Sequence, residues 1–149
     1  MTSRTERMLL EDAEELGWIG LRAPASGARP GSDAGDLWLG RLRVIQHEWG
    51  GDAETVTELL IVEEKYKSNE HNKYIQEKGD KLDSMIELAE KMGARPVLAV
   101  RWSTRVEWSP GATHYMIDAR DIERTASGNI SVKPETALEK FDPVDDFLS

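Results

Sequence analysis

The stretch that decides the fold is Leu59-Leu60-Ile61-Val62-Glu63-Glu64-Lys65. Its first four residues form a continuous apolar run, as in a strand that is buried on both faces. Charged side chains follow at once, and ionised groups at the end of a buried strand need a partner, a ligand or the edge of a cleft. Successive side chains of a strand point to opposite faces, so Glu63 and Lys65 share one face and Glu64 takes the other. The stretch therefore predicts a buried strand that presents a carboxylate and an ammonium group to one ligand.

The residues before this strand predict a helix and a hairpin. The expected elements are an amphipathic helix over residues 4–16, a short strand over 18–22, a loop rich in Gly, Pro and Ser over 23–35, and a strand over 36–48. The turn signal Gly50-Gly51-Asp52 comes before a strand over residues 55–65. We expect these last two strands to form a long antiparallel hairpin. If Asp36 lies beside Glu63 and Lys65 there, two carboxylates and one lysine converge.

The residues after this strand predict a helical cover and more strands. We expect a polar loop over residues 66–74, a helix over 78–92, strands over 95–102 and 115–117, and a short helix over 119–124. The element order indicates an α/β domain over residues 1–133, with a mixed β-sheet flanked by helices. An acidic C-terminal tail, residues 134–149, is expected to be partly unstructured.

Composition limits the chemistry of any bound metal. The chain has 149 residues, which suits one domain, and it has no cysteine. Disulfides and thiolate metal sites are therefore excluded, and carboxylate oxygens favour Mg²⁺ or Mn²⁺. The histidines at 47, 71 and 114 share no ligand spacing, so we assign them no metal role. The sequence has no signal core and no membrane span, which indicates a cytoplasmic protein of a cell or of a virus-infected host.

The net charge of −9 argues, by itself, against a nucleic-acid partner. The charges are unevenly distributed, however, because residues 20–47 are rich in arginine and residues 134–149 are rich in acid. A strongly acidic surface also suits concentrated salt, where the Debye length falls to about 3 Å at 1 M. We therefore expect a halophilic origin.

Asp36, Glu63 and Lys65 have the chemistry that phosphodiester hydrolysis needs. Two carboxylates can hold Mg²⁺, which polarises a phosphoryl oxygen and activates water, while the lysine stabilises or positions charge. Charged residues make up 32% of the chain, so Glu-x-Lys also arises easily in a solvated or structural pair. The apolar run in front of Glu63 favours a site.

Four segments in this order resemble one protein family. They are Glu6-Arg7, Leu21-Arg22-Ala23-Pro24-Ala25-Ser26-Gly27, Asp36-Leu37, and Val62-Glu63-Glu64-Lys65-Tyr66-Lys67-Ser68. The chain resembles the archaeal Holliday-junction resolvases, which have the restriction-endonuclease-like fold. The likeness continues through the helix that ends at Gly93 and the segment 122–129, and it covers roughly residues 4–133.

The resemblance implies roles for particular residues. Glu6, Asp36 and Glu63 would be metal ligands for Mg²⁺, with Mn²⁺ able to substitute, and Lys65 would be the catalytic lysine. Ser26 would lie near the scissile phosphate. The residues expected to contact DNA are Arg22, Arg29, Lys67 and Lys81. The family also implies a homodimer that nicks two strands of a four-way junction symmetrically, during recombination or replication.

The sequence departs from the family in three places. Gly35 stands where the family usually has proline, so Asp33 competes with Asp36 as the ligand; the strand pattern after Asp36 favours the latter. The hairpin is longer and adds His47-Glu48-Trp49, which we interpret as a DNA or subunit contact. The surface is also less basic. A related nuclease that cuts flaps or duplex DNA, or a non-catalytic protein that binds DNA branches, are the alternatives.

Overall fold

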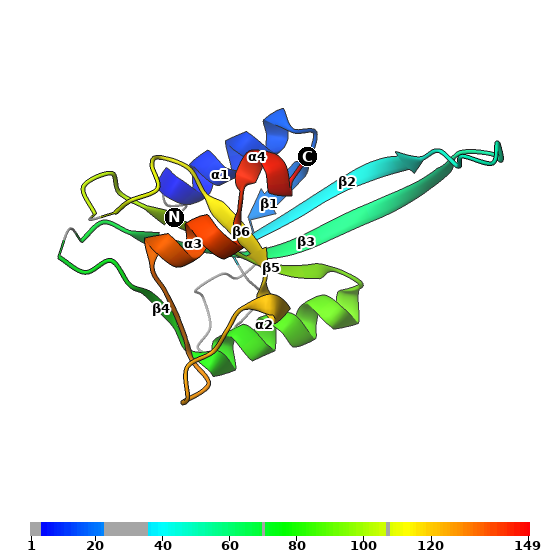
Figure 1. The fold of residues 1–149 in the computed structure, drawn as a ribbon. Coiled ribbons are helices and arrows are strands. Elements are labelled where there is room, and N and C mark those ends of the chain that lie inside the picture. The colour runs from blue at the N-terminus through cyan, green and yellow to red at the C-terminus, as the bar shows by residue number, and fades with distance from the viewer. Residues whose placement is uncertain (1–3, 23–35, 70, 107) are drawn as a thin grey trace.

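The computed structural model describes residues 4–22, 36–69, 71–106 and 108–149. Its centre is a sheet with the strand order β1-β2-β3-β5-β6-β8 (Figure 1). The strands are β1 (Ile19–Arg22), β2 (Leu37–Ile45), β3 (Glu54–Lys67), β5 (Arg95–Trp102), β6 (Tyr115–Asp118) and β8 (Asp142–Pro143). β3 and β5 pair in parallel and the other neighbouring pairs are antiparallel, so the predicted mixed sheet is confirmed.

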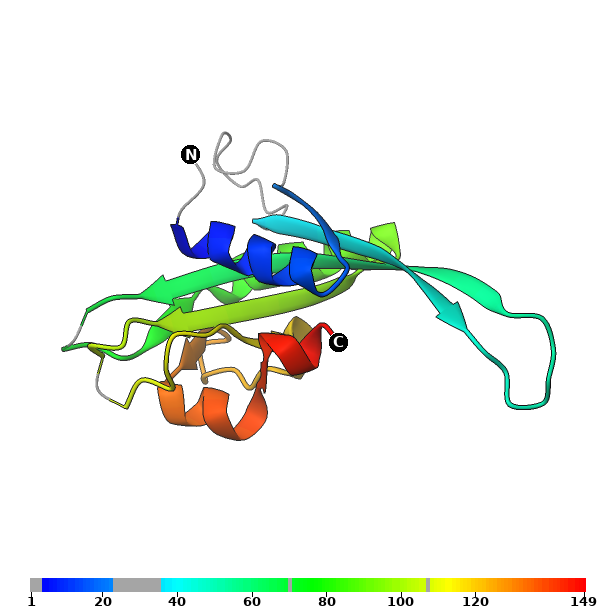
Figure 2. The same ribbon diagram turned by 90° about the horizontal axis from the view of Figure 1, so that it is seen from above.

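The hairpin of β2 and β3 extends well beyond the rest of the molecule (Figure 2). Its register runs from Leu37 opposite Val62 to Ile45 opposite Glu54. We call residues 42–58, which form its outer part, the arm. At the tip the ring of His47 stacks on that of Trp49, with centroids 4.8 Å apart. The predicted long antiparallel hairpin is therefore confirmed, and its outer half is an exposed two-stranded ribbon.

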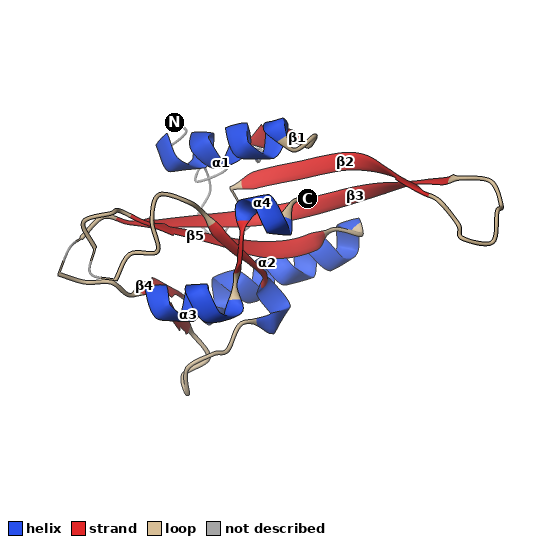
Figure 3. Ribbon diagram, turned by 45° about the horizontal axis from the view of Figure 1, so that its top comes forward, coloured by secondary structure: helices blue, strands red, loops and turns tan. Residues whose placement is uncertain are grey.

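Helices lie on both faces of the sheet (Figure 3). One face carries α1 (Arg4–Glu15) and α4 (Val144–Phe147), and the other carries α2 (Gly79–Met92) and α3 (Pro134–Lys140). A small second sheet of β4 (Ile75–Glu77) and β7 (Ile130–Val132) packs on the α2 side. In the described ranges no helix is both long and apolar enough to cross a lipid bilayer.

Strand β3 contributes side chains to two hydrophobic cores, one on each face of the sheet. Leu60 and Val62 pack with Leu9 and Ala13 of α1, whereas Ile61 packs with the helix α2. Because both faces are covered, the run from Leu60 to Glu64 is buried without interruption. The alternation continues past Val62, so it also decides which face each of the following charged residues takes.

Three expectations for the middle of the chain need correction. The helix predicted over residues 119–124 is a single 3-10 turn, η1 (Ala119–Asp121). The Asp118 side chain accepts a hydrogen bond from the Arg120 N–H at 2.9 Å, and the backbone is already extended at Ile122. Strand β3 also continues to Lys67, into the predicted loop, and the strands β4 and β7 were not predicted.

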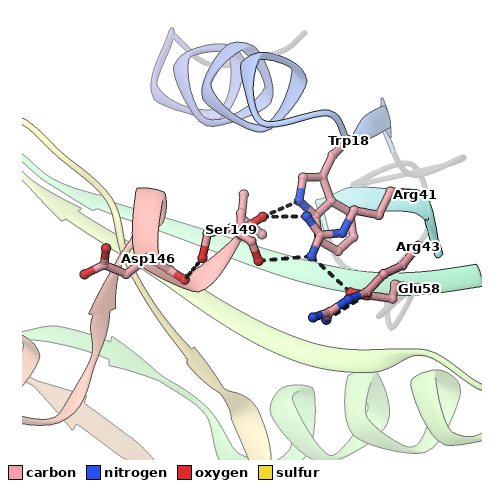
Figure 4. Close-up of polar contacts among 7 residues, drawn as sticks. Trp18, Arg41, Arg43, Glu58, Asp146 and Ser149 are labelled. Atoms are coloured by element: carbon pink, nitrogen blue, oxygen red, sulfur yellow. Dashed lines mark hydrogen bonds and ion pairs between the residues drawn. The ribbon is translucent and has the colours of Figure 1, made fainter. Parts of the chain in front are cut away.

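The expectation of a partly unstructured tail after Lys133 is wrong. Residues 134–149 form α3, β8 and α4, and the side chains of Phe141, Val144 and Leu148 are buried. Figure 4 shows how the segment is anchored: the Leu148 carbonyl accepts hydrogen bonds from Trp18 Nε1 and Arg41 Nη1, both at 2.8 Å. The acidic side chains stay at the surface, whereas Val144 and Leu148 pack in the core on the α1 face and Phe141 packs in the core on the α2 face.

The Arg41 side chain connects this segment to the base of the arm. Its guanidinium lies over the Trp18 ring, 4.3 Å from the centroid, and contacts the Ser149 carbonyl at 3.1 Å and a Glu58 carboxylate oxygen at 3.4 Å (Figure 4). Cation–π contacts of this kind contribute about 0.5–2 kcal/mol each. Arg41 therefore fixes the base of the arm to Leu148 and Ser149.

Asp118→Asn is expected to destabilise the protein at neutral pH, and less so in acid. Burial alone would raise the pKa of Asp118, but hydrogen bonds from Arg120 and Arg95 outweigh it and hold this pKa well below its usual range. A depressed folded-state pKa adds stability above the ordinary carboxyl value of 3.8, and that stability is lost as the pH falls through the folded-state pKa. Urea unfolding of both proteins at a series of pH values measures the difference; one that stays constant in acid would contradict this account.

Candidate active site

Asp36 and Glu63 lie next to each other, as the hairpin predicts. The Asp36 N–H donates to the Val62 carbonyl at 2.8 Å, next to the end of the β2–β3 register at Leu37 and Val62. In return Asp36 Oδ2 accepts a hydrogen bond from the Glu64 N–H, also at 2.8 Å. The start of β2 therefore places the Asp36 carboxylate beside the Glu63 residue, at the point where the apolar run of β3 ends.

Glu63 points to the α2 face and meets two lysines. Lys65 Nζ lies 3.5 Å from Glu63 Oε1, and Lys81 Nζ lies 3.1 Å from the same oxygen. Only 5% of the Glu63 surface is exposed, so this carboxylate relies on the lysines rather than on water. Glu64 takes the opposite face, where its Oε2 is 2.7 Å from His114 Nε2 in a buried pair.

Glu77 completes the group, and the sequence-based reasoning did not select it. Its Oε2 is 2.6 Å from Lys65 Nζ and 3.9 Å from Lys81 Nζ. The available signal was the spacing of four between Glu77 and Lys81, which suits an ion pair along a helix. We refer to Asp36, Glu63, Lys65, Glu77 and Lys81 as the carboxylate–lysine cluster.

The pKa values of two carboxyl groups in the cluster are raised, which means that their ionised forms are disfavoured. Burial raises the pKa of Asp36, and the nearby charge of Glu6 raises it further. Burial also raises the pKa of Glu63, with the neighbouring Asp36 carboxylate as the next contribution. Burial would lower the pKa of Lys81, but the contact with Glu63 outweighs it and raises this pKa. Ionising both carboxylates therefore calls for a compensating cation.

The donor set suits Mg²⁺ or Mn²⁺ bound partly by water and substrate. Across the described ranges, no three or more His, Cys, Asp and Glu side chains are grouped to hold an ion by themselves. Mg²⁺ usually needs only one or two carboxylates, with waters and substrate phosphates filling the remaining positions. Asp36 and Glu63 meet that requirement, since the half-buried Asp36 lies beside the buried Glu63 and burial raises the pKa of both carboxyl groups.

The other predicted site residues fall into two groups. Glu6 lies in the first turn of α1, where its charge acts on Asp36, and Lys67 ends β3 on the same face as Glu63 and Lys65. Ser26, Arg29 and the competing ligand Asp33 lie outside the described residues. Arg22 ends β1, but its side chain is not described either.

A mixed sheet with helices on both faces, and with an acid pair and a lysine at the end of its central hairpin, is typical of restriction-endonuclease-like nucleases. The family model of the archaeal Holliday junction resolvase (Hjc) matches residues 53–146, more than half of the chain. The chain therefore belongs to this family, and the resemblance seen in the sequence is confirmed. It is a structure-specific nuclease that resolves Holliday junctions.

A solved structure supports the fold assignment. The Holliday junction resolvase Hjc from the archaeal hyperthermophile Archaeoglobus fulgidus matches with a TM-score of 0.71. The match covers 99% of this chain and 100% of that chain, at 18% sequence identity. No curated protein sequence matches the chain. The predicted nuclease fold is thus confirmed even though most residues differ.

Proposed function

We propose that this resolvase is metal-dependent and that the carboxylate–lysine cluster is its catalytic centre. The observation that carries the proposal is the adjacency of the half-buried Asp36 and the buried Glu63, with Lys65 Nζ 3.5 Å from Glu63. Asp36 and Glu63 would hold Mg²⁺, which Mn²⁺ can replace, and Glu6 would add its charge from α1. The bound metal would supply Lewis-acid polarisation of the phosphoryl oxygen and a water of lowered pKa.

The lysines have a second task in this proposal, which is to keep the acids ionised before DNA binds. Lys81 contacts Glu63, and Glu77 holds the ammonium of Lys65 at 2.6 Å. Lys65 would place its ammonium where negative charge develops on the phosphoryl group. Glu77 would then be a positioning residue that restricts where the Lys65 ammonium can lie.

Further residues are proposed to contact the DNA. Lys67 and Lys81 lie on the same side as Glu63, so they suit phosphates that flank the scissile bond. Arg22, Arg29 and Ser26, at the end of β1 and in the sequence that follows it, are proposed to contact the same duplex. Two such centres acting on opposite strands would resolve the junction by paired nicks, in recombination or replication.

The test compares labelled four-way junctions, flaps and linear duplex. We expect junction cleavage with Mg²⁺ or Mn²⁺ and none in EDTA, with linear duplex cut much more slowly. Glu63→Ala serves as the inactive control. Cleavage that persists in EDTA would contradict the metal, and equal cutting of linear duplex would contradict junction selectivity.

Salt dependence tests the proposed halophilic origin. We expect cleavage to persist near molar salt, because a surface with a net charge of −9 suits such conditions. Ordinary phosphate-contact binding loses about 10³–10⁵ in affinity between 50 and 200 mM salt. Loss of activity by about 0.2 M would therefore contradict a halophilic origin.

We also propose that the chain acts as a homodimer through an exposed apolar face. Ile19, Leu21, Leu42 and Val44 are each more than half exposed. They share the α2 face of β1 and β2, and α2 packs instead on Ile61 and Leu98 of the neighbouring strands. Soluble monomers seldom expose contiguous apolar patches of this kind. The patch adjoins Trp38, two residues from Asp36, so a dimer formed here would bring two catalytic centres to one surface.

The double variant Leu21→Asp/Leu42→Asp is expected to be monomeric, because two carboxylates would be desolvated in the interface. Sedimentation velocity measures the mass before and after the change. Leu138→Asp is the matched control, since Leu138 is 56% exposed on α3, away from the patch. A wild-type monomer, or a double variant that still dimerises, would contradict the choice of this face.

A further inference from the structure

A cleft of about 480 Å³ lies on the face of the sheet opposite the carboxylate–lysine cluster. It is bordered by the first turns of α1, the ends of β3 and β5, and the loop that follows β5. The residues that matter here are Arg4, Tyr66, Arg101, Ser103 and Thr104. Tyr66 pairs with Arg101 across the parallel strands and shares the face of Glu64, which fixes the side of the sheet.

The lining of this cleft is positive in a strongly acidic protein. The chain has 28 Asp and Glu against 19 Lys and Arg, yet the described lining includes two arginines and no acid. Hydroxyl groups of Tyr66, Ser103 and Thr104 supply further donors. Met8, Trp102 and Ala112 also line the cleft, but its charged groups are both positive, so the cleft is suited to an anion rather than to a cation.

Arg101 is the most informative residue of the cleft. It is only 8% exposed, and among the described residues its guanidinium makes no hydrogen bond or ion pair. Glu64, a buried acid on the same face of the sheet, is already paired with His114 at 2.7 Å, and Asp12 interacts with Arg101 only at electrostatic range. The Arg101 nitrogens are not among the fully enclosed side-chain atoms that lack a partner, so the guanidinium opens into the cleft, where an anion can pair with it.

We propose that Arg101 and Arg4 bind a backbone phosphate in one of the DNA duplexes that meet at the junction. The planar guanidinium presents a fork of donors that matches two phosphate oxygens, and a hydroxyl group can donate to a third. The first turn of α1 borders the cleft through Arg4, while Glu6 on the same turn acts electrostatically on Asp36. DNA that reaches both sides of this turn places one phosphate in the cleft and another at the cluster.

This inference rests on the junction-resolving function and not on the proposed metal. Binding is therefore measured in EDTA, as the dissociation constant of a labelled four-way junction at several salt concentrations. For Arg101→Gln we expect affinity to fall about tenfold to a hundredfold and the salt slope to fall by about one. Arg4→Gln is expected to lower the slope similarly, with a smaller loss of affinity. Lys91→Gln removes a charge that is 71% exposed at the far end of α2, and it should change neither quantity.

Two further measurements distinguish DNA binding by Arg101 from a purely structural role of this residue and from binding of a free anion. Arg101→Lys keeps the charge but loses the fork, so it should keep the salt slope and weaken binding several-fold. If Arg101→Gln does not fold, Arg4→Gln decides the outcome. An unchanged slope in the folded variants would overturn the proposal. So would thermal stabilisation by inorganic phosphate at constant ionic strength combined with an unchanged slope, because the cleft would then take a free anion only.

Discussion

Glu63→Gln is expected to abolish junction cleavage while the protein stays folded and still binds DNA. The substitution removes one of two adjacent carboxylates proposed to hold the metal, but it keeps the size and shape of the side chain. Loss of a single electrostatic catalytic group typically costs about 10²–10³ in rate, and loss of a metal ligand costs at least as much. Folding should survive, because the pKa of Glu63 is raised by burial and by Asp36, so its charge is not a source of stability.

Glu64→Gln is the matched control for this variant. Glu64 is the next residue and is equally buried, but it faces His114 on the other side of the sheet. Its backbone N–H, which donates to Asp36, is unchanged by the substitution. We expect a stability loss of about 1 kcal/mol and cleavage within several-fold of the wild type. Single-turnover cleavage and urea unfolding measure the two effects; equal inactivity of both variants would contradict the assignment of Glu63.

Trp18→Ala is expected to produce the largest loss of stability, about 3–5 kcal/mol. The indole is 4% exposed, packs in the core under α1, donates to the Leu148 carbonyl and carries the Arg41 guanidinium on its face. Its removal leaves a cavity and frees both the C-terminal segment and the root of the arm. Since whole domains are stable by about 5–15 kcal/mol, this is a large fraction of the total.

Trp49→Ala serves as the comparison, because Trp49 is 79% exposed at the tip of the arm. Its loss should change the free energy of unfolding by less than about 0.5 kcal/mol. Guanidinium unfolding of the three proteins at the same salt concentration measures the difference. Similar losses for both variants would show that the contacts around Trp18 do not stabilise the fold in the way described.

The sequence predicted those elements whose pattern is long and periodic. The strand Arg95–Trp102 was placed at its observed bounds, and the helix ending at Met92 was placed within one residue. Alternation along the strand also separated Glu63 from Glu64 correctly, because both faces of the sheet are covered and each side chain has one possible direction. These features depend on local sequence, which is why they could be read from it.

The missed features depend on contacts between distant residues. Strands β4 and β7 have three residues each, too few for a period, and they form because they pair with each other. Glu77 joins the cluster only because β4 places it beside Lys65. The C-terminal segment was expected to be partly unstructured because it is rich in acids, whereas contacts with Trp18 and Arg41, more than a hundred residues away, fix its position.

The charges along the central strand β3 are unevenly distributed, with acidic residues in the arm and lysines at the opposite end. Residues 44–58 contain Glu48, Asp52, Glu54 and Glu58 but no lysine or arginine, whereas Lys65 and Lys67 lie at the other end of β3. A polyanion that approaches the arm meets like charge within a Debye length of about 8 Å at physiological salt, and it is deflected toward the opposite end. The acidic end of β3 is therefore expected to repel DNA and the lysine end to attract it, so that the phosphate backbone approaches on the side of the proposed catalytic centre.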